Sequence, residues 1–175
     1  MSLANFFIGG LHPGSPFGTL NRSLDTLSMP RDFPPGRRTN ERTKAMHPNE
    51  RLARKEIELI NAGELDALNE MYDEDLILHY PGRNPLAGDY ENVDDFLTKA
   101  QELLGEGTLR RELHDAFGSD DHAIQLLNVT AEVGDRAHSW RAVAVMHVRG
   151  GKVSEVWLHI DDQHGLDDFL NSLVS

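Results

Sequence analysis

Four consecutive segments between residues 109 and 160 alternate apolar and polar side chains: "LRRELHDAF" (109–117), "HAIQLLNVTAEV" (122–133), "AHSWRAVAVMHV" (137–148) and "KVSEVWLHI" (152–160). A period of two residues is typical of β-strands with one buried face. The junctions between the segments contain Gly118, Gly134 and the pair Gly150–Gly151, which favour tight hairpin connections. The pattern predicts an antiparallel meander of four strands.

An apolar pattern with helical spacing lies upstream of this meander. Ala53, Ile57 and Ile60 recur at i, i+4 and i+7. Pro48 suits the first turn of a helix, and Gly63 supplies a stop signal after the last turn. The pattern predicts a helix that begins just after Met46.

The chain between this helix and the meander is predicted to form two more helices, with a strand and a loop between them. A short helix covers 65–72, and the apolar run "LILHY" (76–80) is a strand. Because a Pro-Gly step cannot continue a helix or a paired strand, "PGRNPLAG" (81–88) is a shaped loop. A third helix runs from its cap residue Asn92 to Gly105.

Helices followed by a long meander predict an α+β fold. We expect the N-terminal helices to pack in the concave face of a curved, mainly antiparallel sheet, which gives a cone with an internal pocket. This domain is predicted to span residues 47–175. Residues 1–46 hold five of the eight prolines and show no sustained period, so they are predicted to form a disordered or poorly ordered leader.

Composition excludes several classes of protein. The 175 residues include no cysteine, which rules out disulfides, thiolate catalysis and cysteine-based zinc sites, and mildly favours a reducing compartment. No apolar run approaches the roughly 18 residues that span a bilayer. We therefore expect a soluble, cytoplasmic protein without a membrane partner.

Charge is unevenly distributed along the chain. Residues 1–46 carry a formal charge of +3 and residues 47–175 carry −15, which together give the net −12. An acidic domain repels phosphate backbones, so no nucleic-acid partner is expected. The basic leader is interpreted as a flexible extension, or as the result of a start placed upstream of Met46, in preference to a targeting peptide, whose amphipathic helix its prolines would break.

Nine histidines raise the question of a metal site. The nearest pairs, His114 with His122 and His159 with His164, lack the spacing of a helical or strand-based metal motif. The segment "GEGTL" (105–109) lacks the Lys-Ser/Thr end of a phosphate loop and precedes a strand. Neither a metal nor a nucleotide cofactor is predicted.

Two segments carry a resemblance to a known family. The loop "HYPGRNPLAGDY" (79–90) and the ending "VWLHIDDQ" (156–163), set in this order of helices and strands, resemble the SnoaL-like branch of the cystatin-like α+β superfamily. This superfamily includes nuclear transport factor two and ketosteroid isomerase. The resemblance implies a cavity for a small, largely apolar molecule and a homodimer formed through the outer sheet face. It does not imply one reaction, because members of several enzyme classes share this fold.

The resemblance also shows which chemistry is missing. In epoxide hydrolases of this superfamily a carboxylate lies on the last strand, partnered by an Arg and an Asp on a neighbouring strand. Here the last strand offers Leu158 or His159 at that position, and the neighbouring strand offers Asn128 and Thr130. Epoxide hydrolysis of that type is therefore not expected.

Strand parity predicts which side chains face the cavity. Asp115 shares a face with Leu113 and Phe117, which makes it the candidate buried carboxylate. Trp140 and Met146 lie on the apolar face of the third meander strand. Asp115 could act as a general base with a raised pKa or be a hydrogen-bonded structural acid, and the second is the commoner role.

The last strand leaves two alternatives open. Alternation sends Trp157 and His159 outward, unless a bulge at Gly150–Gly151 reverses the register. His79, where the strand meets the Pro-Gly loop, could bind a substrate carbonyl, act as an acid or base, or cap loop amides. Tyr80 points to the opposite face from His79, so at most one of them lines the pocket.

The predicted site combines these residues. The candidate catalytic residues are His79, Asp115 and His159. The candidate substrate-binding residues are Tyr80, Phe117, Asn128, Trp140, Met146 and Trp157. Trp140 and Met146 could equally be plain core.

Two classes of function follow. The first is a small-molecule-binding protein that could act as a cofactor-free isomerase, cyclase or hydrolase and move protons on a small hydrophobic carbonyl or polycyclic compound. The second is a non-catalytic ligand-binding or dimerisation module. A cavity into which at least two polar side chains converge would favour the first class.

Overall fold

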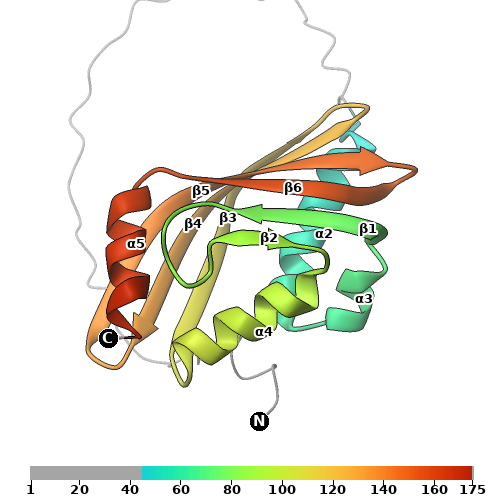
Figure 1. Ribbon diagram of the computed structural model, residues 1–175. Helices are drawn as coiled ribbons and strands as arrows, with labels where there is room; N and C mark the ends of the chain where they lie inside the picture. Colours follow the sequence, from blue (N-terminus) through green and yellow to red (C-terminus); the bar gives the residue numbers. More distant parts are fainter. Residues whose placement is uncertain (1–44, 175) are drawn as a thin grey trace, which may run out of the picture. The chain divides into compact units, whose positions relative to one another are not determined.

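Six strands form one curved sheet in the computed structural model, which describes residues 45–174 (Figure 1). The strands are β1 (Tyr72–Tyr80), β2 (Gly88–Tyr90), β3 (Thr108–Gly118), β4 (His122–Val133), β5 (Arg136–Arg149) and β6 (Lys152–Ile160). Their order across the sheet is β2-β1-β6-β5-β4-β3. Strands β3 to β6 pair antiparallel in sequence, as predicted, whereas β1 pairs with β6 in parallel.

Four helices accompany the sheet in the described residues: α2 (Pro48–Ala62), α3 (Leu65–Asn69), α4 (Val93–Leu104) and α5 (Gln163–Ser172). Figure 1 shows α2 and α4 packed within the curve of the sheet. This arrangement confirms the predicted α+β fold with helices on the concave face of a mainly antiparallel sheet. The sheet curves without closing on itself. The predicted leader lies outside the described residues, apart from Ala45 and Met46, and stays a prediction.

The ends of α2 and α4 follow the expected chemistry. Pro48 occupies the first turn of α2, and Gly63 closes the helix in the left-handed conformation with φ 70°. At the start of α4, the side chain of Asn92 accepts a hydrogen bond of 2.8 Å from the backbone N–H of Asp95. Both helix boundaries were predicted from these residues.

Four elements differ from the prediction. The second helix ends at Asn69, and Tyr72 begins β1 because its ring and hydroxyl are buried in the core. The short strand β2 and the C-terminal helix α5 were not predicted. The carboxylate of Asp162 caps α5 by accepting a hydrogen bond of 3.0 Å from Gly165 N–H.

The inner face of the sheet is apolar along β5. Trp140, Ala142, Ala144 and Met146 of β5 are buried there, as the alternation predicts. On β6 the register pairs His159 with Val143 on the outer face, so the alternative of a reversed register is excluded. Burial of this apolar face against the helices is the main stabilising contribution to the fold.

Strand β3 contains an irregularity that changes which residues face inward. Its pairing with β4 shifts between Leu113 and Asp115, so that one extra residue, His114, is not paired with any residue of β4. A bulge of one residue reverses the alternation beyond it. Ala116 is consequently buried, whereas Phe117 is 50% exposed. The prediction that Asp115 and Phe117 share the inner face of Leu113 is wrong for this reason.

The helices of residues 45–174 are all too short or too polar to cross a bilayer.

Candidate functional site

Two neighbouring cavities lie between the helices and the concave face of the sheet. The first has a volume of about 80 Å³, and its walls include Tyr80, Leu86, Trp140 and Leu170. The second has a volume of about 70 Å³, and its walls include Glu56, Tyr72, Gln125 and Met146. Both cavities are lined by Phe96, Arg111, Leu127 and Leu158. The lining is apolar except where a few polar groups meet.

A buried carboxylate forms the polar end of the second cavity. Glu56 projects from α2 and is only 5% exposed. The hydroxyl of Tyr72 on β1 donates to its Oε1 at 2.6 Å, and Nε2 of Gln125 on β4 donates to its Oε2 at 2.6 Å. Gln125 Nε2 also donates to the carbonyl of Ala53 at 2.7 Å. Three elements of the fold therefore fix the position of this carboxyl group.

Burial is the largest influence on the pKa values of Glu56 and Tyr72. It raises the pKa of Glu56, while the hydrogen bonds from Tyr72 and Gln125 and the charge of Arg111 act in the opposite direction. Burial also raises the pKa of Tyr72, and the neighbouring Glu56 adds to that rise. Tyr72 thus stays a hydrogen-bond donor, and Glu56 exchanges its proton at a higher pH than an exposed glutamate.

Arg111 on β3 supplies positive charge at the boundary of the two cavities. Its Nη1 atom is buried, and burial lowers the pKa of the guanidinium to about 10, against the opposing effect of the Glu56 charge. Arg111 therefore remains protonated at neutral pH. Asn61 Nδ2 on α2 donates to the Arg111 carbonyl at 2.9 Å, which ties this part of β3 to the helix. The result is a cation held in largely apolar surroundings.

Three of the predicted site residues line the cavities. Tyr80 and Trp140 form part of the first cavity, and Met146 forms part of the second. The ring of Tyr80 packs against Phe96 of α4 with the centroids 5.1 Å apart. These positions agree with a substrate-binding role, which stays a prediction.

His79 lies on the outer face of the sheet, not at the cavity. Its Nδ1 atom is 2.7 Å from Asp89 Oδ1, its Nε2 atom is 3.0 Å from Glu155 Oε1, and its ring stacks on Trp157. Burial lowers the pKa of His79, but the hydrogen bonds and charges of the two carboxylates outweigh it, so the pKa lies above the usual value. The expected position of His79 at the pocket entrance is wrong, because alternation along β1 gives that side to Tyr80.

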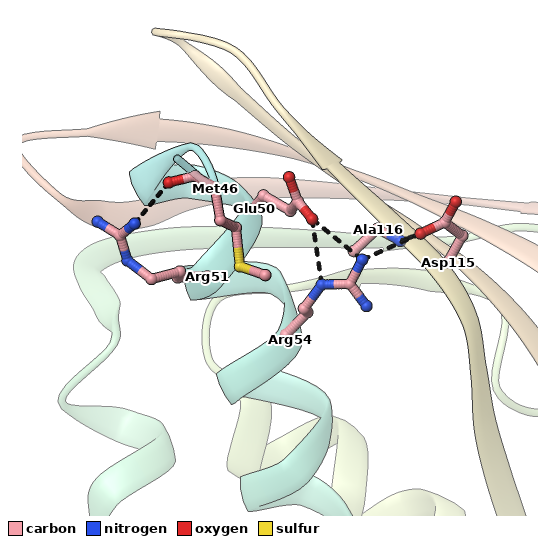
Figure 2. A network of polar contacts seen from close by, with 6 residues as sticks. All are labelled: Met46, Glu50, Arg51, Arg54, Asp115 and Ala116. Atoms are coloured by element: carbon pink, nitrogen blue, oxygen red, sulfur yellow. Dashed lines mark hydrogen bonds and ion pairs between the residues drawn. The ribbon is translucent and has the colours of Figure 1, made fainter. Parts of the chain in front are cut away.

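Asp115 is likewise absent from the walls of both cavities, and Figure 2 shows the contacts that it makes instead. Its Oδ1 accepts hydrogen bonds from Ala116 N–H at 2.8 Å and from Arg54 Nη2 at 3.0 Å, and Arg54 also pairs with Glu50. The Ala116 N–H, followed by Arg54, holds the pKa of Asp115 below its usual range. Of the two roles open to Asp115, the general base with a raised pKa is wrong, whereas the hydrogen-bonded acid agrees with these contacts. The expected position of Asp115 inside the cone is wrong, and so is the expected lining role of Phe117.

The remaining candidates face outward. His159 and Asn128 line a hollow of about 450 Å³ on the outer face, together with His114, Val143 and others. Trp157 packs between His79 and the edge of the His147 ring. Neither cavity is lined by these three candidates, so their expected contact with a ligand in the cone is not supported.

Glu56, Tyr72 and Gln125 line the second cavity but are not among the site residues predicted from the sequence. Glu56 interrupts the apolar stripe of α2 between Ala53 and Ile60, and Gln125 interrupts the inner face of β4. A charged or amide side chain on a buried face is a signal that the sequence carries. Tyr72 was assigned to a helix and so could not be placed beside Glu56.

Within residues 45–174 no group of three or more His, Cys, Asp or Glu side chains is arranged to hold a metal ion. The absence of a metal or other cofactor stays a prediction.

Fold and cavity together define an α+β protein with an apolar interior and a buried acid–cation cluster. The SnoaL-like domain family matches residues 53–156, more than half of the chain, and the chain belongs to this family. This confirms the resemblance inferred from the sequence. No curated protein matches the chain by sequence.

Solved structures share the fold. Bal32a, from a soil-derived mobile gene cassette, is 25% identical and covers 70% of this chain and 96% of its own, with a TM-score of 0.65. A protein of unknown function with a cystatin-like fold from Xanthomonas campestris is 24% identical, covers 70% and 98%, and has a TM-score of 0.63. TerC, co-crystallized with polyporic acid, is 13% identical, covers 71% and 98%, and has a TM-score of 0.60.

Proposed function

We propose that the protein binds a small, mainly apolar molecule in the two cavities, with an acidic or carbonyl oxygen of that molecule facing Arg111. The observation that carries this proposal is the position of Arg111, which lines both cavities among apolar side chains. A buried cation attracts an oxygen that carries full or partial negative charge far more strongly than an exposed one does. TerC, which shares the fold, was co-crystallized with polyporic acid.

The charge of Glu56 is compatible with an acidic ligand. An anion beside Arg111 would be repelled by a second buried carboxylate. Because burial raises the pKa of Glu56, protonation of this residue offers a way to relieve that repulsion. The binding of an acid is therefore expected to favour the neutral form of Glu56.

The volumes limit the size of the ligand. A water molecule needs about 10–15 Å³ on the same scale, so each cavity of about 80 or 70 Å³ has room for a single ring or a short branched chain. A polycyclic compound would require the side chains between the cavities to move. We therefore favour a monocyclic ligand.

Acid–base catalysis is the enzymatic extension of this binding function. Glu56 in its ionised form could accept a proton from the carbon next to a ligand carbonyl, while the electron pair moves to the carbonyl oxygen and gives an enolate that Arg111 stabilises. Return of the proton to another carbon would complete an isomerisation. Exchange of the α-protons of cyclopentanone in D₂O, followed by NMR, tests this step, and Glu56→Gln should abolish any exchange above the background rate.

The main alternative is a module that only binds or only dimerises. The convergence of Glu56, Tyr72 and Arg111 on the cavities favours the ligand-binding class. We also propose that a second copy of the chain covers the outer sheet face, where Val143 and Val145 lie between Arg141 and His147. Ligand binding and dimerisation are compatible, because they use opposite faces of the sheet.

A matched set of three probes tests the proposed function. Benzoate, benzamide and toluene share one ring and differ in the oxygen that could face Arg111. The thermal midpoint of the wild-type protein should rise most with benzoate, less with benzamide and least with toluene, and Arg111→Met should remove the advantage of benzoate. Equal effects of benzoate and toluene, or no effect of any of the three, would contradict the proposal.

A further inference from the structure

The wall of the first cavity is completed by two segments that are far apart in the sequence. Leu86 belongs to the loop between β1 and β2, residues 81–87, which we call the 81–87 loop. Leu170 belongs to α5. Both leucines are almost fully buried, and Figure 1 shows the loop and α5 lying side by side. What holds the loop to α5 therefore shapes the cavity.

A single carboxylate joins these two segments. Asp167 of α5 is largely buried and accepts hydrogen bonds from the backbone N–H of Arg83 at 2.9 Å and from Asn84 Nδ2 at 2.5 Å. Gln163 Nε2, one turn earlier in α5, donates to the same carboxylate at 2.9 Å. These hydrogen bonds outweigh the effect of burial and keep the pKa of Asp167 below its usual value. Asp167 is therefore a charged acceptor for donors of the loop.

Asn84 connects Asp167 to Leu86 in the cavity wall. Its Oδ1 accepts a hydrogen bond of 2.9 Å from Leu86 N–H, while its Nδ2 donates to Asp167. The position of Leu86 thus depends on Asn84, and the orientation of Asn84 depends on Asp167. A second contact, from Asn171 Nδ2 to the carbonyl of Arg83 at 3.0 Å, reinforces the same junction.

Gly82 allows the loop to approach Asp167 this closely. Its φ is +109°, and a Cβ atom at this position would lie 2.3 Å from Asp167 Oδ1 and 2.3 Å from Gln163 Nε2. The positive φ strains any residue other than glycine, and a Cβ atom would displace the side-chain ends of Asp167 and Gln163 from their contacts. The Pro-Gly step that interrupts the sequence after β1 therefore serves the contact between the loop and α5.

The packing of α5 on the sheet also buries a polar atom of His138, which is destabilising. The ring of His138 on β5 is stacked between Trp140 and Phe169 of α5, at centroid distances of 5.8 and 5.6 Å. Within the described part of the chain, its Nε2 atom is buried without a hydrogen-bond partner. A buried polar atom in this state is destabilising, and it would be hydrated if α5 moved away. The buried Nε2 atom of His138 thus disfavours the contact between α5 and the sheet, whereas the hydrogen bonds of Asp167 stabilise the contact between α5 and the loop.

We propose that Asp167 is a positioning residue that holds the 81–87 loop and α5 together over the first cavity, and that small molecules enter the cavity where this junction opens. This deepens the proposed function by naming the entrance, and it rests on that function for its purpose. Access to the cavity can nevertheless be measured without any ligand.

Trp140 reports on that access, since it lines the first cavity and the chain has only one other tryptophan, Trp157. In a Trp157→Phe background, acrylamide, a small neutral quencher, measures how often Trp140 is reached. Asp167→Asn should raise the quenching constant of Trp140 about threefold or more, because local opening exposes groups in proportion to its population. Asp168→Asn is the matched control, since Asp168 is an exposed neighbour in the same helix, and it should leave the constant unchanged.

A second background separates opening at the junction from loosening of the whole domain. With Trp140→Phe, the remaining Trp157 on the outer face should be quenched equally in the Asp167→Asn and Asp168→Asn proteins. A rise at both tryptophans, or no rise at Trp140 in folded Asp167→Asn protein, would overturn the proposal. If Asp167→Asn does not fold, Asn84→Ala, which keeps the carboxylate but breaks its link to Leu86, decides the question by the same measurement.

The benzoate titration distinguishes this proposal from the proposed function. An increase in Trp140 quenching without any stabilisation by benzoate would support the entrance and contradict the ligand class. Stabilisation by benzoate with unchanged quenching would support the ligand class and contradict the entrance.

Discussion

The hydroxyl of Tyr72 donates a hydrogen bond of 2.6 Å to Oε1 of Glu56, and both side chains are buried. The bond joins the first strand of the sheet to the first helix of the domain at the floor of the second cavity. Substitutions of Tyr72 or Glu56 should therefore affect both the stability of the fold and the properties of the second cavity.

Removal of this hydroxyl should be costly. Tyr72→Phe leaves a buried carboxyl group without one of its donors and is expected to lower the free energy of unfolding by about 1–3 kcal/mol. Urea denaturation measures the change. Tyr80→Phe is the control, because Tyr80 is also buried and lines the neighbouring cavity, where its ring packs against Phe96. An equal loss in both variants would show that the hydroxyl of Tyr72 has no special role.

Stability should depend on pH through Glu56. Because the pKa of Glu56 is raised in the folded state, the folded protein retains a proton that the unfolded chain releases. The stability from this group is complete below the usual pKa of glutamate and is lost as the pH rises through the folded value, by about 1.4 kcal/mol for each pKa unit of difference. The free energy of unfolding of the wild type should therefore fall relative to Glu56→Gln as the pH rises. A constant difference between pH 4 and 8 would count against a raised pKa.

Asp115→Asn should leave ligand binding unchanged. Its ion pair with Arg54, drawn in Figure 2, is partly exposed to solvent, so salt screens it. The lowered pKa means that its contribution to stability is present above the usual pKa of aspartate and is lost as the pH falls through the folded value. The loss on mutation should be smaller than that of Tyr72→Phe. Weaker binding of benzoate by this variant would reinstate Asp115 as a site residue.

The outer face should mediate self-association. Val145 lies at the centre of that face, paired with Ile124 on one side and Trp157 on the other. The wild-type chain is expected to sediment as a dimer at micromolar concentration, and Val145→Lys should shift it to the monomer by burying a charge without a partner. Ser139→Lys, on an exposed part of the same strand, is the control. A wild-type chain that sediments only as a monomer contradicts this prediction.

Gly82 in the 81–87 loop and Gly88 at the start of β2 provide a matched test of the loop contact. Gly82 and Gly88 both have positive φ angles, of 109° and 143°, but a Cβ at Gly88 meets nothing within 4 Å. Gly88→Ala should cost about 1–3 kcal/mol through backbone strain alone. Gly82→Ala adds the clash with Asp167 and should cost more and increase quenching of Trp140. Equal costs would mean that the junction adapts freely.

The fold was predictable where a local pattern determines the structure. The alternation of the meander, the caps at Asn92 and Gly63, and the apolar stripe of α2 all depend on neighbours in sequence. The inner face of β5, with Trp140 and Met146, followed from the same alternation.

The site was less predictable because it depends on contacts that no local pattern contains. One extra residue at His114 reverses the alternation of β3, and neither glycine nor proline marks the place. The contact between Arg83 and Asp167 joins residues 84 positions apart. Glu56 did leave a visible signal on an apolar helix face, but its partner Tyr72 could be found only once β1 had been extended back to it.

The parallel pairing of β1 with β6 also determines when the interior can form. Leu78 lies opposite Val156, so the first strand of the sheet meets its neighbour only after nearly eighty further residues have been synthesised. Until then β1 has only the three-residue strand β2 beside it. Contacts between residues so distant in sequence slow folding, because the entropy of closing the intervening chain is lost before the strands pair. A nascent chain halted before β6 would therefore leave the backbone N–H and C=O groups along one edge of β1 unpaired. This protein should depend on the completion of its synthesis, or on a chaperone, to a greater degree than a helical protein of the same length.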